Sequence, residues 1–154
     1  MKKINWRGVL ISGLIVGTAD ILCAFAKANI QYGTKPGPVL EYIASGVFGN
    51  SAFGGGLSTQ LAGLLFHFLI AFGLTTVFFV LRPSSALKIF TGIVYGCFAW
   101  VITNLVIVPL SAVGAPKKPF DQWQAALNAG ILVIAIGIPL AFLEPFFRKK
   151  TSQP

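Results

Sequence analysis

The stretch GVLISGLIVGTADILCAFAKA, residues 8–28, decides the class of this protein, because it is long and apolar enough to cross a lipid bilayer. An α-helix rises by about 1.5 Å per residue, so roughly 20 apolar residues cover the hydrocarbon core of a membrane. This stretch nevertheless carries Asp20 in its interior. An ionisable side chain inside a span is costly, and it is therefore a hypothesis about function.

Three more runs of comparable length and hydrophobicity follow, at residues 57–81, 87–110 and 125–145. The 154-residue chain is 55% hydrophobic and only 10% charged, whereas soluble domains carry about 25% charged residues. Four spans with short connections leave little chain for a soluble domain. We therefore expect an all-α membrane protein with four transmembrane helices, forming a single integral membrane domain over residues 1–154.

The positions of the basic residues predict an orientation in the membrane. Eight of the twelve fall on one side of a four-span arrangement: Lys2, Lys3, Arg7, Arg82, Lys88, Arg148, Lys149 and Lys150. The other four fall on the opposite side: Lys27, Lys35, Lys117 and Lys118. The positive-inside rule then predicts a multi-pass protein of the bacterial inner membrane with both termini cytoplasmic. Since the +8 net charge follows the membrane sides, we expect the lipid bilayer and its anionic headgroups as partners, and no nucleic acid.

The connection at residues 29–56 is rich in glycine and proline, which end the first helix. Pro38 fits the first turn of a new helix, where its missing N–H does no harm. Val39, Leu40, Ile43 and Val47 then fall on one face. We expect a short amphipathic or re-entrant helix in this first outer connection.

Two spans carry glycines at a spacing of four residues, Gly13 with Gly17 and Gly92 with Gly96. Small residues at this spacing let two helices approach closely and gain van der Waals contact. These four glycines are therefore predicted helix-packing positions. The contact they make is either within the chain or in a homo-oligomer.

The polar residues inside the spans are the candidate functional residues. Counted along their helices from the outer ends, Asp20 and His67 both lie about 12–13 Å deep, and His67 is the sole histidine of the chain. Lys27 follows Asp20 by seven residues and so shares its helix face. Asn104 and Asn128 lie nearer the outer boundary of their spans. These five residues predict a polar column that opens outward.

Two interpretations of Asp20 and His67 remain open. A buried carboxylate and an imidazole that interact can titrate together near neutral pH and form a proton or ion relay. Alternatively, a hydrogen bond between them ties two spans together, because buried polar groups need partners in any case.

Other chemistry finds no support in the residue types. The sequence contains neither an H-E-x-x-H nor a G-x-S-x-G motif. Cys23 and Cys97 lie in different spans, at different depths, and read as small buried apolar residues. We therefore expect no enzyme activity, no catalytic residues, no metal site and no cofactor.

The glycine step of the first span with its later lysine, the pair His67–Phe68, and the connection PLSAVGAPKKPFDQW at residues 109–123 resemble the YagU-like family. The resemblance implies a small four-span bacterial inner-membrane protein of undefined mechanism, in a family associated with acid resistance. His67 and the 109–123 connection are the matching positions. Asn128 stands where the family carries a second membrane histidine, so a mechanism with two histidines does not transfer to this chain.

Together these patterns predict a membrane protein that handles protons or a small solute, with Asp20 and His67 as the titrating pair and Lys27 as the outer gate. Two alternatives remain. The chain is a structural or assembly subunit that packs through its glycine faces, or it is a small exporter that works as a dimer around a membrane carboxylate.

Overall fold

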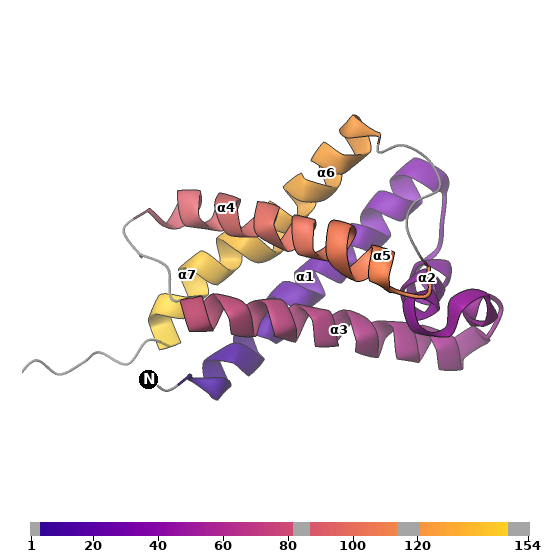
Figure 1. Ribbon diagram of the computed structural model, residues 1–154, viewed down its shortest axis with the longest axis horizontal. Coiled ribbons are helices and arrows are strands. Elements are labelled where there is room, and N and C mark those ends of the chain that lie inside the picture. The colour runs from indigo at the N-terminus through magenta and orange to yellow at the C-terminus, as the bar shows by residue number, and fades with distance from the viewer. Residues whose placement is uncertain (1–3, 82–86, 114–120, 148–154) are drawn as a thin grey trace, which may run out of the picture.

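The computed structural model describes residues 4–81, 87–113 and 121–147, and within these ranges the regular structure is entirely helical (Figure 1). Four helical segments are long and apolar enough to cross a membrane. They are α1 (Trp6–Tyr32), α3 (Gly56–Leu81), Lys88–Leu110, and Gln122–Phe147. The prediction of an all-α fold with four helical segments long and apolar enough to span a membrane is confirmed for the described residues.

The third and fourth segments each contain a stretch of π-helix. The third consists of α4 (Lys88–Val101), the π-helical η2 (Ile102–Ile107) and α5 (Val108–Leu110). The fourth consists of α6 (Gln122–Leu132), the π-helical η3 (Val133–Gly137) and α7 (Ile138–Phe147). The first connection folds as α2 (Pro36–Phe48) and a 3₁₀ turn, η1 (Gly49–Ala52).

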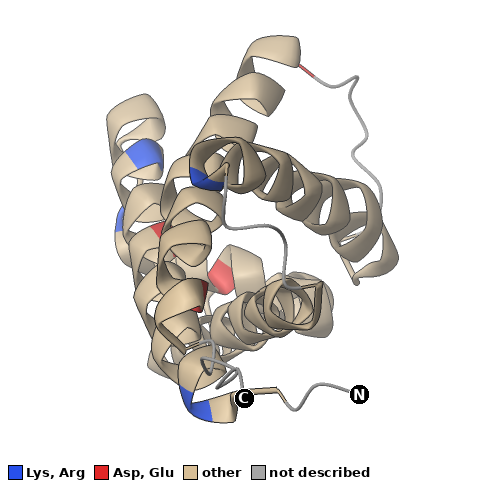
Figure 2. Cartoon of the chain, turned by 90° about the vertical axis from the view of Figure 1, so that its left-hand side faces the viewer, with Lys and Arg blue, Asp and Glu red and all other residues tan. Residues whose placement is uncertain are grey.

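Apolar side chains cover the outside of the bundle. Large residues on all four segments are exposed, among them Leu14, Leu65, Phe90 and Ile134. Charged residues occupy few positions along the long helices (Figure 2). Lipid requires such a surface, because it offers no hydrogen bonds to polar side chains.

Asn5 joins the two described ends of the chain. Its Oδ1 accepts a hydrogen bond from the backbone N–H of Gly8 at 3.1 Å and so caps α1. Its Nδ2 donates to the carbonyl oxygen of Phe147 at 2.9 Å, at the end of α7. Both ends therefore lie at one end of the bundle, and α2 lies at the opposite end (Figure 1).

The first pair of predicted packing glycines lies against α3. A Cβ built on Gly17 would meet the ring of Phe68 at 2.9 Å, and one on Gly13 would overlap the ring of Phe72. The absence of side chains at these two positions lets α3 lay its aromatic rings directly on the backbone of α1. The glycine step of the first span is therefore occupied by a helix of the same chain.

The second pair lies against the fourth segment, where backbone meets backbone. A Cβ on Gly92 would lie 2.6 Å from the Cα of Ile138, and one on Gly96 would overlap the Cα of Val133. A Cβ on Gly137 would in turn overlap the carbonyl oxygen of Gly92. This pair too is used within the chain, and the contact is closer than the one between α1 and α3.

Each π-helical stretch ends two residues before a proline, Pro109 after η2 and Pro139 after η3. A proline inside a helix cannot donate to the carbonyl four residues earlier, and its ring clashes with that carbonyl. A wider turn relieves the clash, as the bonds from Val108 N to Thr103 O and from Ile138 N to Val133 O show. The π-helical geometry of both segments therefore has a cause in the sequence.

The buried core lies toward the end that carries the described termini. Its members come from all four segments: Val9, Val16, Leu74, Phe78, Phe79, Tyr95, Ala99, Ala135, Ile136, Leu140 and Ala141. Tyr95 of α4 contacts the ring of Phe78 edge-on, with centroids 4.7 Å apart, and its hydroxyl donates to the carbonyl oxygen of Leu74. These contacts close α3 against α4 in this half of the bundle.

The expected short helix is present as α2, and it is packed tightly on α3. A Cβ on Gly63 would overlap the carbonyl oxygen of Leu40, so the two backbones touch at this crossing. Glu41 reinforces the contact, because its carboxylate accepts hydrogen bonds from Gln60 Nε2 at 3.1 Å and from Gly54 N at 3.2 Å. α2 is therefore fixed to α3 by backbone contact and by polar bonds.

Candidate functional site

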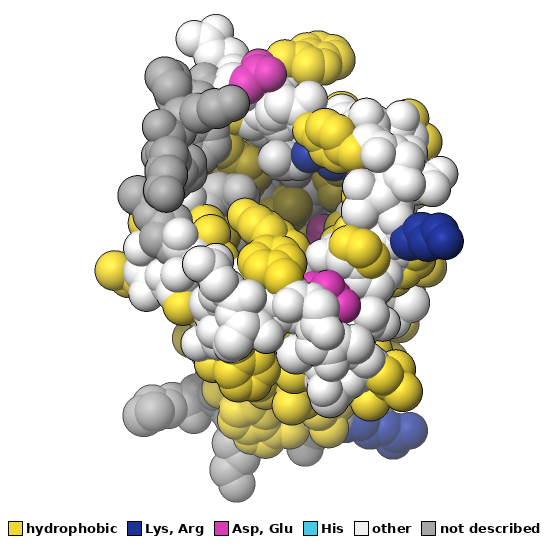
Figure 3. All heavy atoms as spheres, turned by 90° about the vertical axis from the view of Figure 1, so that its right-hand side faces the viewer, with side chains coloured by type: hydrophobic (Ala, Val, Ile, Leu, Met, Phe, Trp, Pro, Cys, Tyr) yellow, Lys and Arg dark blue, Asp and Glu magenta, His cyan; other side chains and the backbone are white. Residues whose placement is uncertain are grey.

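A cavity of about 870 Å³ lies between the helices in the half of the bundle nearer α2. Its walls come from α1, α2, α3, the η2–α5 stretch and the fourth segment. It opens at the α2 end of the molecule, where Figure 3 shows a hollow with acidic and basic side chains inside it. The five residues predicted to form a polar column, Asp20, Lys27, His67, Asn104 and Asn128, all line this cavity.

α2 forms one side of the mouth, and the end of the third segment forms another. Val39, Ile43 and Val47 line the cavity, as a common apolar face predicts. Leu40, predicted on that same face, lies at the crossing with α3 instead. A hydrogen bond of 2.8 Å from Ala112 N to Gly46 O joins α2 to the segment that follows α5.

His67 is held by the backbone of α1. Its Nε2 lies 2.8 Å from the carbonyl oxygen of Gly17. A carbonyl can only accept, so Nε2 carries the hydrogen and Nδ1 is the nitrogen that remains to accept a proton. This hydrogen bond fixes the orientation of the imidazole ring. Its acceptor, Gly17, lies about one helical turn before Asp20 on α1.

Asp20 is half-buried in the cavity wall, three residues after Gly17 and on the same face of α1. It interacts electrostatically with His67. Within the described ranges, however, no hydrogen bond joins the two side chains, so the predicted tie between spans is made by the Gly17 carbonyl instead. The carboxylate therefore remains available to water or to a ligand in the cavity.

Lys27 links α1 to the fourth segment. Its Nζ donates to Asn128 Oδ1 at 2.5 Å, and both side chains are partly buried. Because Lys27 follows Asp20 along α1, which runs toward α2, it lies nearer the α2 end of the bundle than Asp20 does. Asn104 belongs to η2, and its Nδ2 donates to the carbonyl oxygen of Trp100 at 3.1 Å, which orients its amide.

Sequence reasoning missed several polar residues of this cavity, notably Tyr42, Thr103 and Ser111. Tyr42 had a usable signal, because it falls three residues after Val39 and next to Ile43, on the same helical face. Thr103 is exposed to the cavity by η2, whose wide turn a proline in the span could have indicated. For Ser111, which follows the end of α5, we find no comparable signal.

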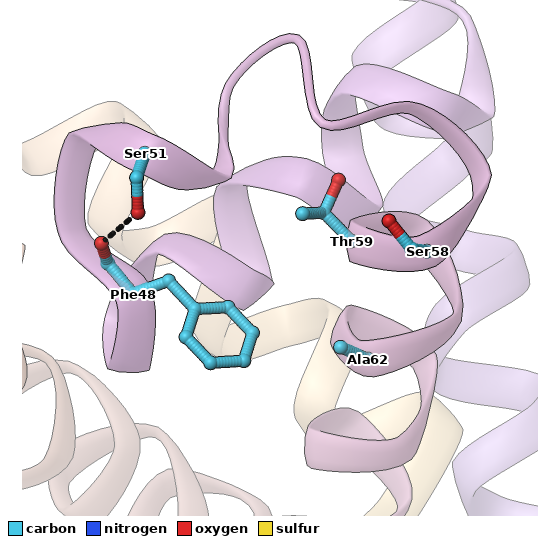
Figure 4. Close-up of a pocket in the computed structure, with 5 residues that line it drawn as sticks. All are labelled: Phe48, Ser51, Ser58, Thr59 and Ala62. Atoms are coloured by element: carbon cyan, nitrogen blue, oxygen red, sulfur yellow. Dashed lines mark hydrogen bonds between the residues drawn. The ribbon is translucent and has the colours of Figure 1, made fainter.

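A second, smaller pocket of about 300 Å³ lies between η1 and the start of α3 (Figure 4). Its hydroxyl groups bond to nearby backbone: Ser51 Oγ donates to Phe48 O at 2.7 Å, and Ser58 Oγ donates to Gly55 O at 3.0 Å. Thr59 does the same to Gly56 O at 3.0 Å. No titratable side chain lines this pocket, so the larger cavity is the candidate site.

In the part of the chain that the structure describes, no three His, Cys, Asp or Glu side chains gather into a group that could hold a metal ion. Comparison with known proteins gives no relative: no family model, no curated protein and no solved structure matches this chain. The cavity and its side chains are therefore the basis for assigning a function.

Proposed function

We propose that this chain is a membrane protein that binds a small solute in the cavity and exchanges protons there through Asp20 and His67. One observation carries the proposal: polar side chains from four separate spans converge on a single cavity of about 870 Å³. Binding sites for small molecules have volumes of about 300–1,000 Å³ and combine apolar walls with a few polar groups. Ionisable residues within spans are typical of proton and solute pathways.

The orientation is part of the proposal. The excess of Lys and Arg on the side of the chain termini supports a bacterial inner-membrane protein with cytoplasmic termini. The cavity then opens to the outside, and α2 lies at the outer membrane interface as a re-entrant cap on its mouth. The resemblance to the YagU-like family supports a role under acid stress, when protons arrive from that side.

The geometry supports a division of roles between the two titrating residues. Nδ1 of His67 accepts a proton from the cavity, while Nε2 stays bonded to the carbonyl of Gly17. The carboxylate of Asp20, one turn away, receives or returns that proton. Because His67 keeps its backbone bond in both protonation states, a change in its charge need not move the helix.

Release to the other side of the membrane requires a second opening. Leu74 lines the floor of the cavity, and its carbonyl accepts the hydrogen bond from Tyr95. Beyond it, Tyr95 and Phe78 close α3 against α4. In this mechanism a transported solute passes when these two helices separate, and Tyr95 is the inner gate.

The rival functions receive less support from the geometry. A scaffold that packs through its glycine faces needs Gly13, Gly17, Gly92 and Gly96 to be accessible, yet each lies against a helix of its own chain. An exporter built as a dimer around a carboxylate shares that carboxylate between two chains. Here the cavity around Asp20 is lined by helices of one chain.

The test is proton flux in liposomes that contain the purified protein and experience an imposed pH step. We expect flux with the native chain, loss of flux in Asp20→Asn, and native flux in Asp121→Asn, which makes the same chemical change at an exposed helix cap. His67→Gln keeps an N–H that can donate to Gly17 O but removes the titrating group, so it should also lose flux. Equal flux in Asp20→Asn and the native protein would contradict the proposal.

A further inference from the structure

Building on the proposed function, we propose that the ligand of this cavity is a small zwitterion with an ammonium group and a carboxylate at opposite ends of an apolar chain. The ammonium lies at Asp20 and the carboxylate lies at Lys27. Three features of the cavity support this assignment: its pair of opposite charges, the space between them, and the position of its mouth.

The charges of the cavity balance while His67 is neutral. Among the described residues that line it, Asp20 is the one acidic side chain and Lys27 is the one lysine or arginine. A cationic ligand would match Asp20 but would be repelled by Lys27, and an anionic ligand would meet the reverse problem. A charge without a counter-charge is unfavourable in apolar surroundings, so a ligand that carries both charges fits best.

The two charges lie at different depths on the same face of α1. Seven residues correspond to about 10 Å along a helix axis, and no ion pair joins the two side chains in the described part of the chain. Ala24 lies between them and also lines the cavity, so a methyl group is the only side chain on α1 in this interval of the wall. Ile70 and Ile131, from two other spans, also supply apolar wall to the cavity. The space between the charges is therefore suited to a chain of methylene groups.

The mouth of the cavity favours a water-soluble ligand over a lipid. The hollow opens at the α2 end of the bundle (Figure 3), and Lys27 lies nearer to this end of α1 than Asp20 does. A solute that enters from water meets the ammonium of Lys27 first and Asp20 deeper in the cavity. This order sets the orientation of the zwitterion, with its ammonium end inward.

Three probes of equal chain length test the proposal by equilibrium binding to the purified full-length protein: ε-aminocaproate, which is zwitterionic, hexylamine, which is cationic, and caproate, which is anionic. We expect the zwitterion to bind at least about tenfold more tightly than either singly charged probe, because it can form one more charge-assisted hydrogen bond than either of them. A thermal melt of each sample shows that the protein is folded.

Two variants should change the preference in opposite directions. Asp20→Asn should weaken the binding of ε-aminocaproate about tenfold or more, so that caproate binds more tightly than hexylamine. Lys27→Met should reverse this order, so that hexylamine binds more tightly than caproate. The matched controls are Asp121→Asn and Lys35→Gln, which make comparable changes at exposed positions outside the cavity. Both controls should bind as the native chain does.

The proposal of a zwitterionic ligand would be contradicted if the native protein bound the three probes equally. It would also be contradicted if the variants lowered the affinity for all three probes by the same factor. Displacement of ε-aminocaproate by phosphatidylethanolamine in mixed micelles would overturn the soluble ligand in favour of a lipid headgroup. Proton flux that depends on Asp20 without binding of ε-aminocaproate would refute the ligand and leave the proposed function standing. The two proposals can therefore fail separately.

Discussion

Replacing Gly92 by alanine tests whether the contact between α4 and α7 holds the bundle together. A Cβ at this position lies 2.6 Å from the Cα of Ile138 and 2.9 Å from its backbone nitrogen, whereas ordinary contact begins at 3.4 Å. About 0.8 Å of separation is therefore missing, and backbone atoms cannot rotate out of the way. Overpacking of this kind costs about 1–3 kcal/mol, and the better helix propensity of alanine returns about 1 kcal/mol.

We therefore expect Gly92→Ala to lower the free energy of unfolding by up to about 2 kcal/mol. Gly73→Ala is the matched control, because Gly73 lies inside α3 and a Cβ there meets nothing within 4 Å. That variant should gain about 0.5–1 kcal/mol from helix propensity alone. Titration with sodium dodecyl sulfate in mixed micelles, followed by tryptophan fluorescence, measures both. If Gly92→Ala were as stable as Gly73→Ala, the close backbone contact would be wrong.

Three further contacts can be tested by substitution. Gly63→Ala should push α2 away from α3 and cost about 1–3 kcal/mol, which hydrogen exchange would report as faster exchange at residues 36–48 while α4 stays protected. Tyr95→Phe keeps the ring contact but removes the hydrogen bond to Leu74 O. Denaturant titration should therefore show a free energy of unfolding lower by about 1 kcal/mol. An unchanged free energy would show that this hydrogen bond does not stabilise the contact between α3 and α4. Asn5→Ala should cost about 1–2 kcal/mol, whereas Asn5→Ser keeps a capping oxygen and loses the amide donor to Phe147 O. A thermal melt that ranks Asn5→Ser below Asn5→Ala would contradict this assignment.

The four spans could be predicted because hydrophobicity and length alone decide whether a helix can cross a membrane. The ends of these helices depend on local signals that the sequence also carries. Gly33 ends α1 in the left-handed conformation, with φ of 62°, so the helix runs past residue 28 to Tyr32. Asp121 starts α6 by accepting from Trp123 N at 2.9 Å. Both signals were present, and both extend the helices beyond the apolar runs.

The cavity could be predicted only in part. Depth along a helix follows from counting residues, and this placed Asp20 and His67 at one level. The rotation of each helix about its axis does not follow from counting, so the bond between His67 and Gly17 could not be foreseen. The pairing of Lys27 with Asn128 depends on where α6 crosses α1, which is decided by packing elsewhere in the bundle.

The unlike contacts in the two helix pairs have a consequence for how the site can change shape. Between α1 and α3, glycines face the rings of Phe68 and Phe72, and an aromatic ring can turn about its χ angles to a new fit. Between α4 and the η3–α7 stretch, main chain lies on main chain, and no rotamer can absorb a displacement. The second pair is therefore a stiff frame and the first pair is its compliant partner. A guest that swells the cavity will move α3, carrying α2 with it, and smaller residues at positions 68 and 72 should tune the size of the guest that fits.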